Sequence, residues 1–296
     1  MEENRDNLKK SFYILPIAIL IFGIIISGTF MIKPDSKIEW SKNETLTAEI
    51  VPDEAVLPVV WGDLGAKLVE AGIINEMKFR SLYEIRDEFS DEYEKLLLGS
   101  EDGNLKINKD NAGYLLNLFW ALGLAQSNPV LTDGPMNDPQ YGSPARFAST
   151  GGWTLASGDA MDHYSRHDFF DLSEDQQKLV EEVSKNIYRP CCGNSVHFPD
   201  CNHGMAMLGL LELMASQGAT EEEMYDTAFL VNSFWFPGNY ETVAEYLALE
   251  GIDWQKVPAK DLLGFTYSSA QGYQKIALEV QKRKGNVSGS VGSCGV

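Results

Sequence analysis

The chain has 296 residues, of which 44% are hydrophobic, and its 43 acidic against 24 basic side chains give a formal net charge of −19. A surface this negative repels phosphate backbones, so the composition argues against a nucleic acid partner. The hydrophobic content is typical of a folded globular protein and argues against extensive disorder.

An uncharged apolar run from Phe12 to Ile32 follows a short polar segment, residues 1–11. Its length matches the roughly 20 residues that a helix needs to cross a bilayer core. It shows no small-residue cleavage site of the kind found in removable signals. Basic residues flank both ends, and we favour an inside N-terminus. The sequence therefore predicts a single-pass cell-membrane protein with residues 1–11 as a cytoplasmic tail and the bulk of the chain extracytoplasmic.

The remainder of the chain divides into a linker, one large domain and a tail. Residues 33–58 are polar and contain three prolines, which is typical of a linker. From 59 to 284 apolar residues recur at helical spacing and strand signals are scarce. Residues 285–296 are rich in Gly and Ser around Cys294 and are expected to be a flexible tail. The predicted fold class is mostly α, an irregular all-helical globular domain behind one N-terminal transmembrane helix.

Several helices carry clear start signals. Ser173 with Gln176 forms a capping-box pattern, and Thr220 precedes three acidic residues that suit the start of a helix. Residues 101–104 are interpreted as a turn because the calcium-loop spacing is incomplete. The main helices are predicted at 111–125, 173–188, 204–216, 220–235, 240–249, 259–263 and 272–284.

The main functional signal is the segment 188–207, which reads Y-R-P-C-C-G-N-S-V-H-F-P-D-C-N-H-G-M-A-M. Thiolate, imidazole and thioether are ligands that soft and borderline metals select. Two prolines and a glycine predict an irregular loop over 191–200, and Asn202 is a plausible N-cap for the helix that follows. The loop and the helix start are expected to face each other. The candidate ligands in this segment are Cys191, Cys192, Cys201, His197, His203 and Met205.

Three interpretations of this segment stay open. The first is a metal site, with copper favoured over zinc and a metal donor or acceptor protein as partner. The second is a structural role, in which a membrane-tethered interaction domain is stapled by a disulfide from Cys191 or Cys192 to Cys201. The third is thiol-disulfide exchange, in which Cys191 or Cys192 attacks and Cys201 resolves. Met205 is the weakest candidate ligand, because Met commonly fills the core beside an apolar helix.

His163 and His167 form a second group of candidate ligands. Their spacing of four residues would place both imidazoles on one face of a helix. They are expected to complete the metal site if this segment folds against the cysteine loop. The glutamate of an H-E-x-x-H pattern is missing, so zinc-peptidase chemistry is not indicated.

The run P-C-C-G at 190–193, followed by D-C-x-H-G at 200–204, resembles bacterial extracytoplasmic proteins named for a P-C-Y-C-G-C motif. The resemblance covers about residues 187–226. It implies an exported, cysteine-rich, metal-associated protein and no particular activity. Here the cysteine run is shorter, and the helix after it lacks the further cysteines of that family.

Overall fold

The computed structural model describes residues 50–285. The predicted transmembrane segment Phe12 to Ile32, most of the predicted linker and Cys294 lie outside the described residues. Within residues 50–285, no helix has both the length and the apolar character needed to cross a bilayer.

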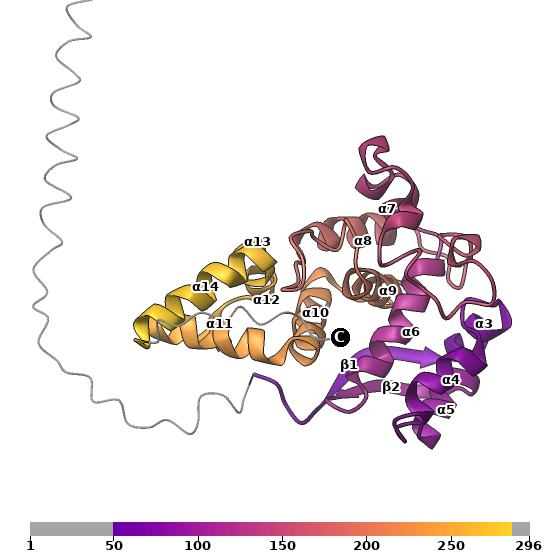
Figure 1. Cartoon of the computed structure of the whole chain (residues 1–296), viewed down its shortest axis with the longest axis horizontal. Helices are drawn as coiled ribbons and strands as arrows, with labels where there is room; N and C mark the ends of the chain where they lie inside the picture. Colours follow the sequence, from indigo (N-terminus) through magenta and orange to yellow (C-terminus); the bar gives the residue numbers. More distant parts are fainter. Residues whose placement is uncertain (1–49, 286–296) are drawn as a thin grey trace, which may run out of the picture. The chain divides into compact units, whose positions relative to one another are not determined.

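Helices dominate the described part of the chain, which confirms the mostly α class (Figure 1). Five short 3-10 turns lie between them. The α-helices are α3 (Leu64–Glu70), α4 (Glu76–Glu84), α5 (Asp91–Leu98), α6 (Ala112–Ala125), α7 (Pro129–Thr132), α8 (Glu174–Asn186), α9 (Asn202–Ser216), α10 (Glu221–Trp235), α11 (Pro237–Leu249), α12 (Ala259–Leu262), α13 (Phe265–Ser268) and α14 (Ala270–Arg283).

The domain is not all helical, because two antiparallel strands pair beside α6. Strand β1 (Glu54–Gly62) begins inside the predicted linker 33–58, and β2 (Glu101–Asn108) occupies the predicted turn at 101–104. Both predictions are therefore corrected. The two strands are separated by three helices, so neither can be recognised from a local hairpin signal.

A period of two in β1 explains why this segment forms a strand. Leu57, Val59 and Trp61 are all buried, and the residues between them are more exposed. Alternation of this kind places one face of a strand on the core. The helical spacing predicted from residue 59 onward is therefore wrong for the end of this strand. The sheet consequently covers the core with one face only.

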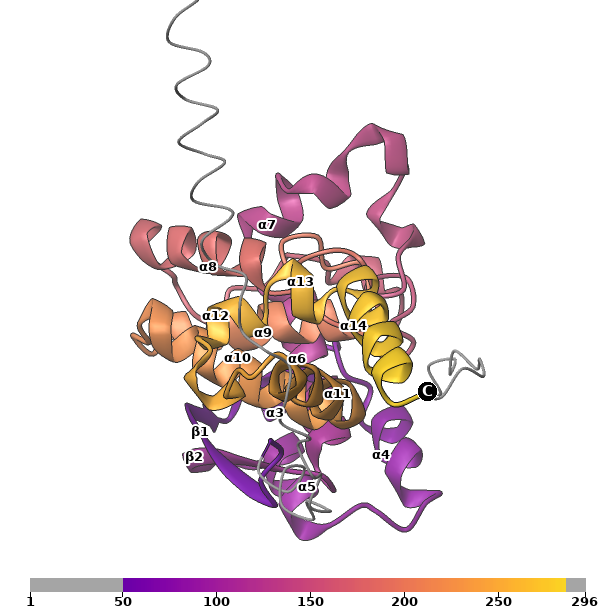
Figure 2. The same cartoon turned by 90° about the vertical axis from the view of Figure 1, so that its left-hand side faces the viewer.

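Helices α6 and α9 form the centre of the domain (Figure 2). A Cβ added to Gly123 of α6 would lie 2.2 Å from the carbonyl oxygen of Met205, and one added to Gly209 of α9 would lie 2.4 Å from that of Phe119. Side chains at these positions would keep the backbones apart. The two glycines therefore let the helices approach closely.

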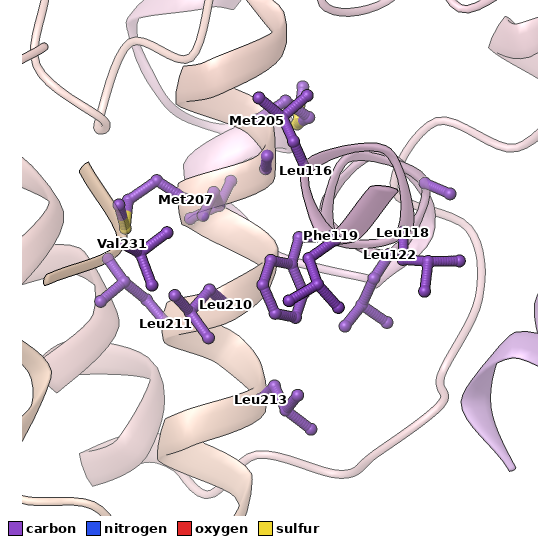
Figure 3. Packing of buried hydrophobic residues seen from close by; sticks show 14 of the residues in the cluster. Leu116, Leu118, Phe119, Leu122, Met205, Met207, Leu210, Leu211, Leu213 and Val231 are labelled. Carbon is purple, nitrogen blue, oxygen red and sulfur yellow. The ribbon is translucent and has the colours of Figure 1, made fainter. Parts of the chain in front are cut away.

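Helix α9 is apolar on every side. In Figure 3, Phe119 and Leu122 of α6 lie on one side of it, and Val231 of α10 lies near Met207 and Leu211 on another. A helix that is hydrophobic all round is expected in the interior. All but the first and last few residues of α9 are buried. The start of α9 is thus fixed by packing along the rest of the helix.

The helices before and after α9 begin as predicted. Ser173 and Gln176 form a capping box at the start of α8, and Thr220 and Glu223 form one at the start of α10. At the end of α8, the Tyr188 backbone N–H donates to the Leu263 carbonyl. The cysteine loop therefore leaves from an anchored point.

A second, smaller core lies between α11, α12 and α14. It is built from Val243, Leu247, Leu262, Ile276 and Val280. Helices α11 and α14 lie side by side in both views (Figures 1 and 2). The first residue of α14, Ala270, donates its backbone N–H to the Cys192 carbonyl over 2.9 Å. The cysteine loop is thereby held by α14 as well as by α9.

Candidate metal centre

The loop after α8 is folded around the guanidinium of Arg189, whose side chain is only 1% exposed. Its Nη1 donates to the Asn194 carbonyl over 2.9 Å, and Nη2 donates to the Phe198 carbonyl over 3.3 Å and to Asp200 Oδ1 over 2.9 Å. The Asn194 amide donates in turn to Asp200 Oδ2 over 2.8 Å. One buried cation thus organises the loop from within.

This loop brings three sulfur atoms and one imidazole together. The Sγ of Cys201 lies 3.7 Å from that of Cys191 and 3.9 Å from that of Cys192. Nδ1 of His203 lies 3.9 Å from Cys191 Sγ. All three cysteines are free thiols. The structure therefore gathers four of the predicted ligands at the junction of the loop and α9.

These distances suit a metal ion. A tetrahedral ion with sulfur ligands at about 2.3 Å holds its sulfurs about 3.8 Å apart. The sulfur-sulfur distances to Cys201 are 3.7 and 3.9 Å. The sulfurs already have the spacing of a coordination shell, so Cys191, Cys192, Cys201 and His203 can hold a metal ion.

Two overlapping sets of ligand atoms share Cys201. In one, the atoms of Cys191, Cys201 and His203 lie within 4.8 Å of one another, and in the other those of Cys192, Asp200 and Cys201 do. Both oxygens of Asp200 already accept hydrogen bonds from the loop. We therefore assign Asp200 to holding the loop, and the first set is the better ligand group.

Cys201 is the cysteine of this site whose pKa is lowered. Hydrogen bonds from Cys191 and Cys192, assisted by the Arg189 cation, hold the pKa of the Cys201 thiol well below its usual range. The Nε of Arg189 lies 3.3 Å from Cys201 Sγ. A thiolate is the form that binds metals. The lowered pKa of Cys201 thus favours the form of this residue that binds metals.

The two neighbouring thiols stay protonated. The hydrogen bonds to Cys192 and Cys201, together with burial, raise the pKa of Cys191. The hydrogen bond with Cys191 lowers the pKa of Cys192, but the one with Cys201 and burial outweigh it and raise that pKa to about 11. The exchange interpretation gave the attacking role to Cys191 or Cys192. Of the three cysteines, however, it is Cys201 whose pKa is lowered.

The observed N-cap of α9 lies one residue earlier in the chain than the predicted one. Cys201 is the residue before the helix, and Asn202, predicted as the N-cap, is the first helical residue. The partial positive charge of a helix N-terminus favours an anion there. The His203 ring packs against Phe236 with centroids 4.5 Å apart, and this contact holds the imidazole beside Cys191. Helix α9 therefore supplies two of the ligands from one turn.

Two predicted ligands of the same segment lie elsewhere. The His197 backbone N–H donates to the Ser184 carbonyl of α8, and its Nδ1 is buried without a hydrogen-bond partner. Met205 is fully buried, and Figure 3 draws it beside Leu116 of α6. Met205 lies on α9, whereas His197 lies in the loop before that helix. Met205 is a core residue, and His197 belongs to neither ligand set.

His163 and His167 do not complete the cysteine site. They follow the 3-10 turn Ala160–Asp162 rather than lying on a helix, and they belong to neither of the two ligand sets found among residues 50–285. Nδ1 of His163 lies 3.1 Å from Nε2 of His167. Burial lowers the pKa of both imidazoles. The two histidines pair with each other instead.

Arg189 belongs to the candidate site but is not among the site residues predicted from the sequence. It directly precedes Pro190 and the two adjacent cysteines, and a cation beside thiols lowers their pKa, so its position was a usable signal. Its complete burial is visible only in the fold. Trp235 and Phe236, which pack on His203, carried no signal of their own, because they lie more than thirty residues later.

Comparison with protein-family models, with curated proteins and with solved structures finds no match to this chain. The geometry of the site is therefore what points to a function.

Proposed function

We propose that this protein binds Cu(I), in preference to Zn(II), through Cys191, Cys201 and His203, and passes the ion to a partner protein. Soft thiolates select soft ions such as Cu(I). Structural zinc is almost always held by four ligands. Here only three ligand atoms of the favoured set are mutually close. Cu(I) accepts such a low coordination number, and this set of three is the observation that carries the proposal.

Exposure of the site supports transfer rather than permanent storage. Cys191, Cys192 and His203 are all partly exposed, so a ligand of a partner protein can reach the bound ion. Cys192 lies 3.9 Å from Cys201 but is not in the set with His203. During the proposed transfer, Cys192 binds the ion beside Cys201. A ligand of the partner protein then replaces His203 or Cys191.

The proposal places this domain outside the cytoplasm, anchored by Phe12 to Ile32. The length of that apolar run and the resemblance of 190–204 to exported cysteine-motif proteins support it. Bound metal also protects thiols from oxidation in such a compartment, because the thiolates are then engaged.

The test is Cu(I) binding by the reduced full-length chain, measured against a colorimetric Cu(I) chelator, with Zn(II) in a parallel series. We expect one Cu(I) per chain. Cys201→Ser should weaken binding by at least about a hundredfold, equivalent to about 2.7 kcal/mol. His203→Ala should weaken it by about tenfold. His197→Ala is the matched control, since His197 lies outside both ligand sets, and it should bind as the unsubstituted chain does.

A second candidate function, thiol-disulfide exchange, is favoured by the Cys201 thiolate with two thiols at 3.7 and 3.9 Å. It predicts that the chain reduces a disulfide substrate and that Cys201→Ser abolishes the reaction. A chain that binds no Cu(I) and is recovered with Cys201 bonded to Cys191 or Cys192 would overturn the copper proposal in favour of this one.

A further inference from the structure

Two of the four histidines of the chain face each other outside the cysteine site. The rings of His163 and His167 have their centroids 5.3 Å apart and are inclined by 25°. Nδ1 of His163 and Nε2 of His167 are 3.1 Å apart, so these two nitrogens face each other.

The fold holds the pair in place from several sides. Ser165 adopts a positive φ of 52°, which turns the chain between the two histidines. The His167 backbone N–H donates to the Ala125 carbonyl at the end of α6, and its carbonyl accepts from the Ser127 N–H. The Phe169 ring stacks on His167 with centroids 5.7 Å apart. The His167 ring therefore lies between two other rings and is fixed at its backbone.

On the other side of the pair, His163 is buried against the α3–α4 connection. A Cβ at Gly72, whose φ is +80°, would lie 3.6 Å from His163 Cε1. The His163 ring is 9% exposed, whereas His167 is partly open to solvent. His163 is thus packed in the interior, and solvent reaches the pair at His167.

We propose that His163 and His167 form a second metal site, for a borderline divalent ion such as Zn(II), with His163 Nδ1 and His167 Nε2 as ligands. Two imidazole nitrogens on a tetrahedral zinc ion, at about 2.0–2.1 Å from the metal, are about 3.3 Å apart. The observed 3.1 Å needs only a small widening. Imidazole is a ligand for zinc, copper and nickel.

Replacement of the shared proton by the metal ion changes neither the number of protons on the two rings nor their charge. In the neutral pair one proton lies between the rings, on one of the two facing nitrogens. When the ion takes that place, this proton moves to the other nitrogen of the same ring, and both imidazoles remain neutral. No third His, Cys, Asp or Glu ligand atom among residues 50–285 joins the pair closely enough to form a set of three. In this proposal water or an outside ligand takes the remaining coordination positions.

This site is tested in the full chain with all four cysteines replaced by serine, which removes every thiol. Zn(II) is titrated into this background and followed by calorimetry. We expect one binding event, weakened at least tenfold by either His163→Gln or His167→Gln. His197→Gln is the matched control and should leave the affinity unchanged, because His197 lies against α8.

Imidazole ¹H–¹⁵N spectra of the same background give a second readout that needs no histidine variant. With four histidines in the chain, the signals can be assigned individually. We expect Zn(II) to shift those of His163 and His167 only. Absence of zinc binding, an affinity unchanged in both pair variants, or shifts confined to His197 and His203 would overturn the proposal. The cysteine site is removed in this background, so the result does not depend on the proposed copper function.

Discussion

At the scale of single residues, the candidate metal centre depends on one buried cation. Arg189 is bonded to two backbone carbonyls, to Asp200 and to Cys201, and it is almost completely buried. A buried charge is tolerated when it is paired and hydrogen-bonded, and removal of one partner leaves the other uncompensated. Gly204 lies so close that a Cβ there would be 2.4 Å from Arg189 Nη2. Arg189 therefore links the loop to the first turn of α9.

We predict that Arg189→Met lowers the free energy of unfolding by about 3–5 kcal/mol, because Asp200 and two carbonyls lose their buried partner. The matched control is Arg283→Met. Arg283 also bonds to two carboxylates and one carbonyl, but its side chain is 37% exposed. Exposed ion pairs contribute about 0–1 kcal/mol. Urea unfolding of the two variants measures the difference, and equal costs would contradict the role of Arg189.

The same Arg189 variant should raise the pKa of Cys201, because it removes a cation that stabilises the thiolate. The ultraviolet absorbance of the thiolate, followed over a pH titration, reports this change. A Cys201 that titrates unchanged would mean that the thiols Cys191 and Cys192 alone hold its pKa low.

At the scale of elements, the contact between α6 and α9 sets the position of the ligands. Cys201 and His203 lie at the start of α9, and the rest of that helix packs on α6 through Gly123 and Gly209. A larger residue at this crossing moves one helix relative to the other. The metal site thus depends on a contact made by residues that touch no ligand.

We predict that Gly123→Ala lowers the free energy of unfolding by about 3 kcal/mol, the upper end of the range typical of overpacking. Gly113→Ala, on the same helix, is the matched control, because a Cβ at Gly113 meets no atom within 4 Å. It should instead raise the stability by about 0.5–1 kcal/mol through helix propensity. Thermal unfolding separates the two outcomes, and similar behaviour of both variants would refute the close contact.

At the scale of the whole molecule, Glu212 joins three separate parts of the chain. It lies on α9, is completely buried and accepts a hydrogen bond from the Asn128 amide. Asn128 Oδ1 in turn accepts from Gln177 of α8 over 2.7 Å. The second oxygen of Glu212 has no hydrogen-bond partner. Burial therefore raises the pKa of this carboxyl well above its usual value.

This raised pKa makes the stability of the domain depend on pH. The contribution of a neutral Glu212 is fully present below the unfolded-state pKa of about 4.3. It is lost as the pH rises through the higher folded-state pKa, because the unfolded state then ionises more readily. We predict that Glu212→Gln, which is neutral at every pH, has a higher unfolding free energy than the unsubstituted chain at pH 8 and a similar one at pH 4.

Denaturant unfolding over that pH range measures the effect. Glu241→Gln is the control, because Glu241 is exposed on α11 and lies beyond its first turn. It should follow the unsubstituted chain throughout. An unchanged pH dependence in Glu212→Gln would show that Glu212 ionises without cost in the folded protein.

Local signals were sufficient for much of this protein. The capping boxes at Ser173 and Thr220, and the apolar segment of α6, specify helices through contacts within a few residues, and all three formed as predicted. The concentration of cysteines between two prolines likewise marked the candidate site, because ligand type is a property of the residues themselves.

Tertiary structure alone decided which of the candidate ligands meet. Strands β1 and β2 pair across three helices, and Arg189 acquires its role only when the loop closes over it. Side-chain direction, set by long-range packing, separates His197 and Met205 from the sulfurs and turns His163 towards His167. A sequence specifies which ligand types are present, whereas distances of 3.7–3.9 Å between them arise from contacts between segments remote in the chain.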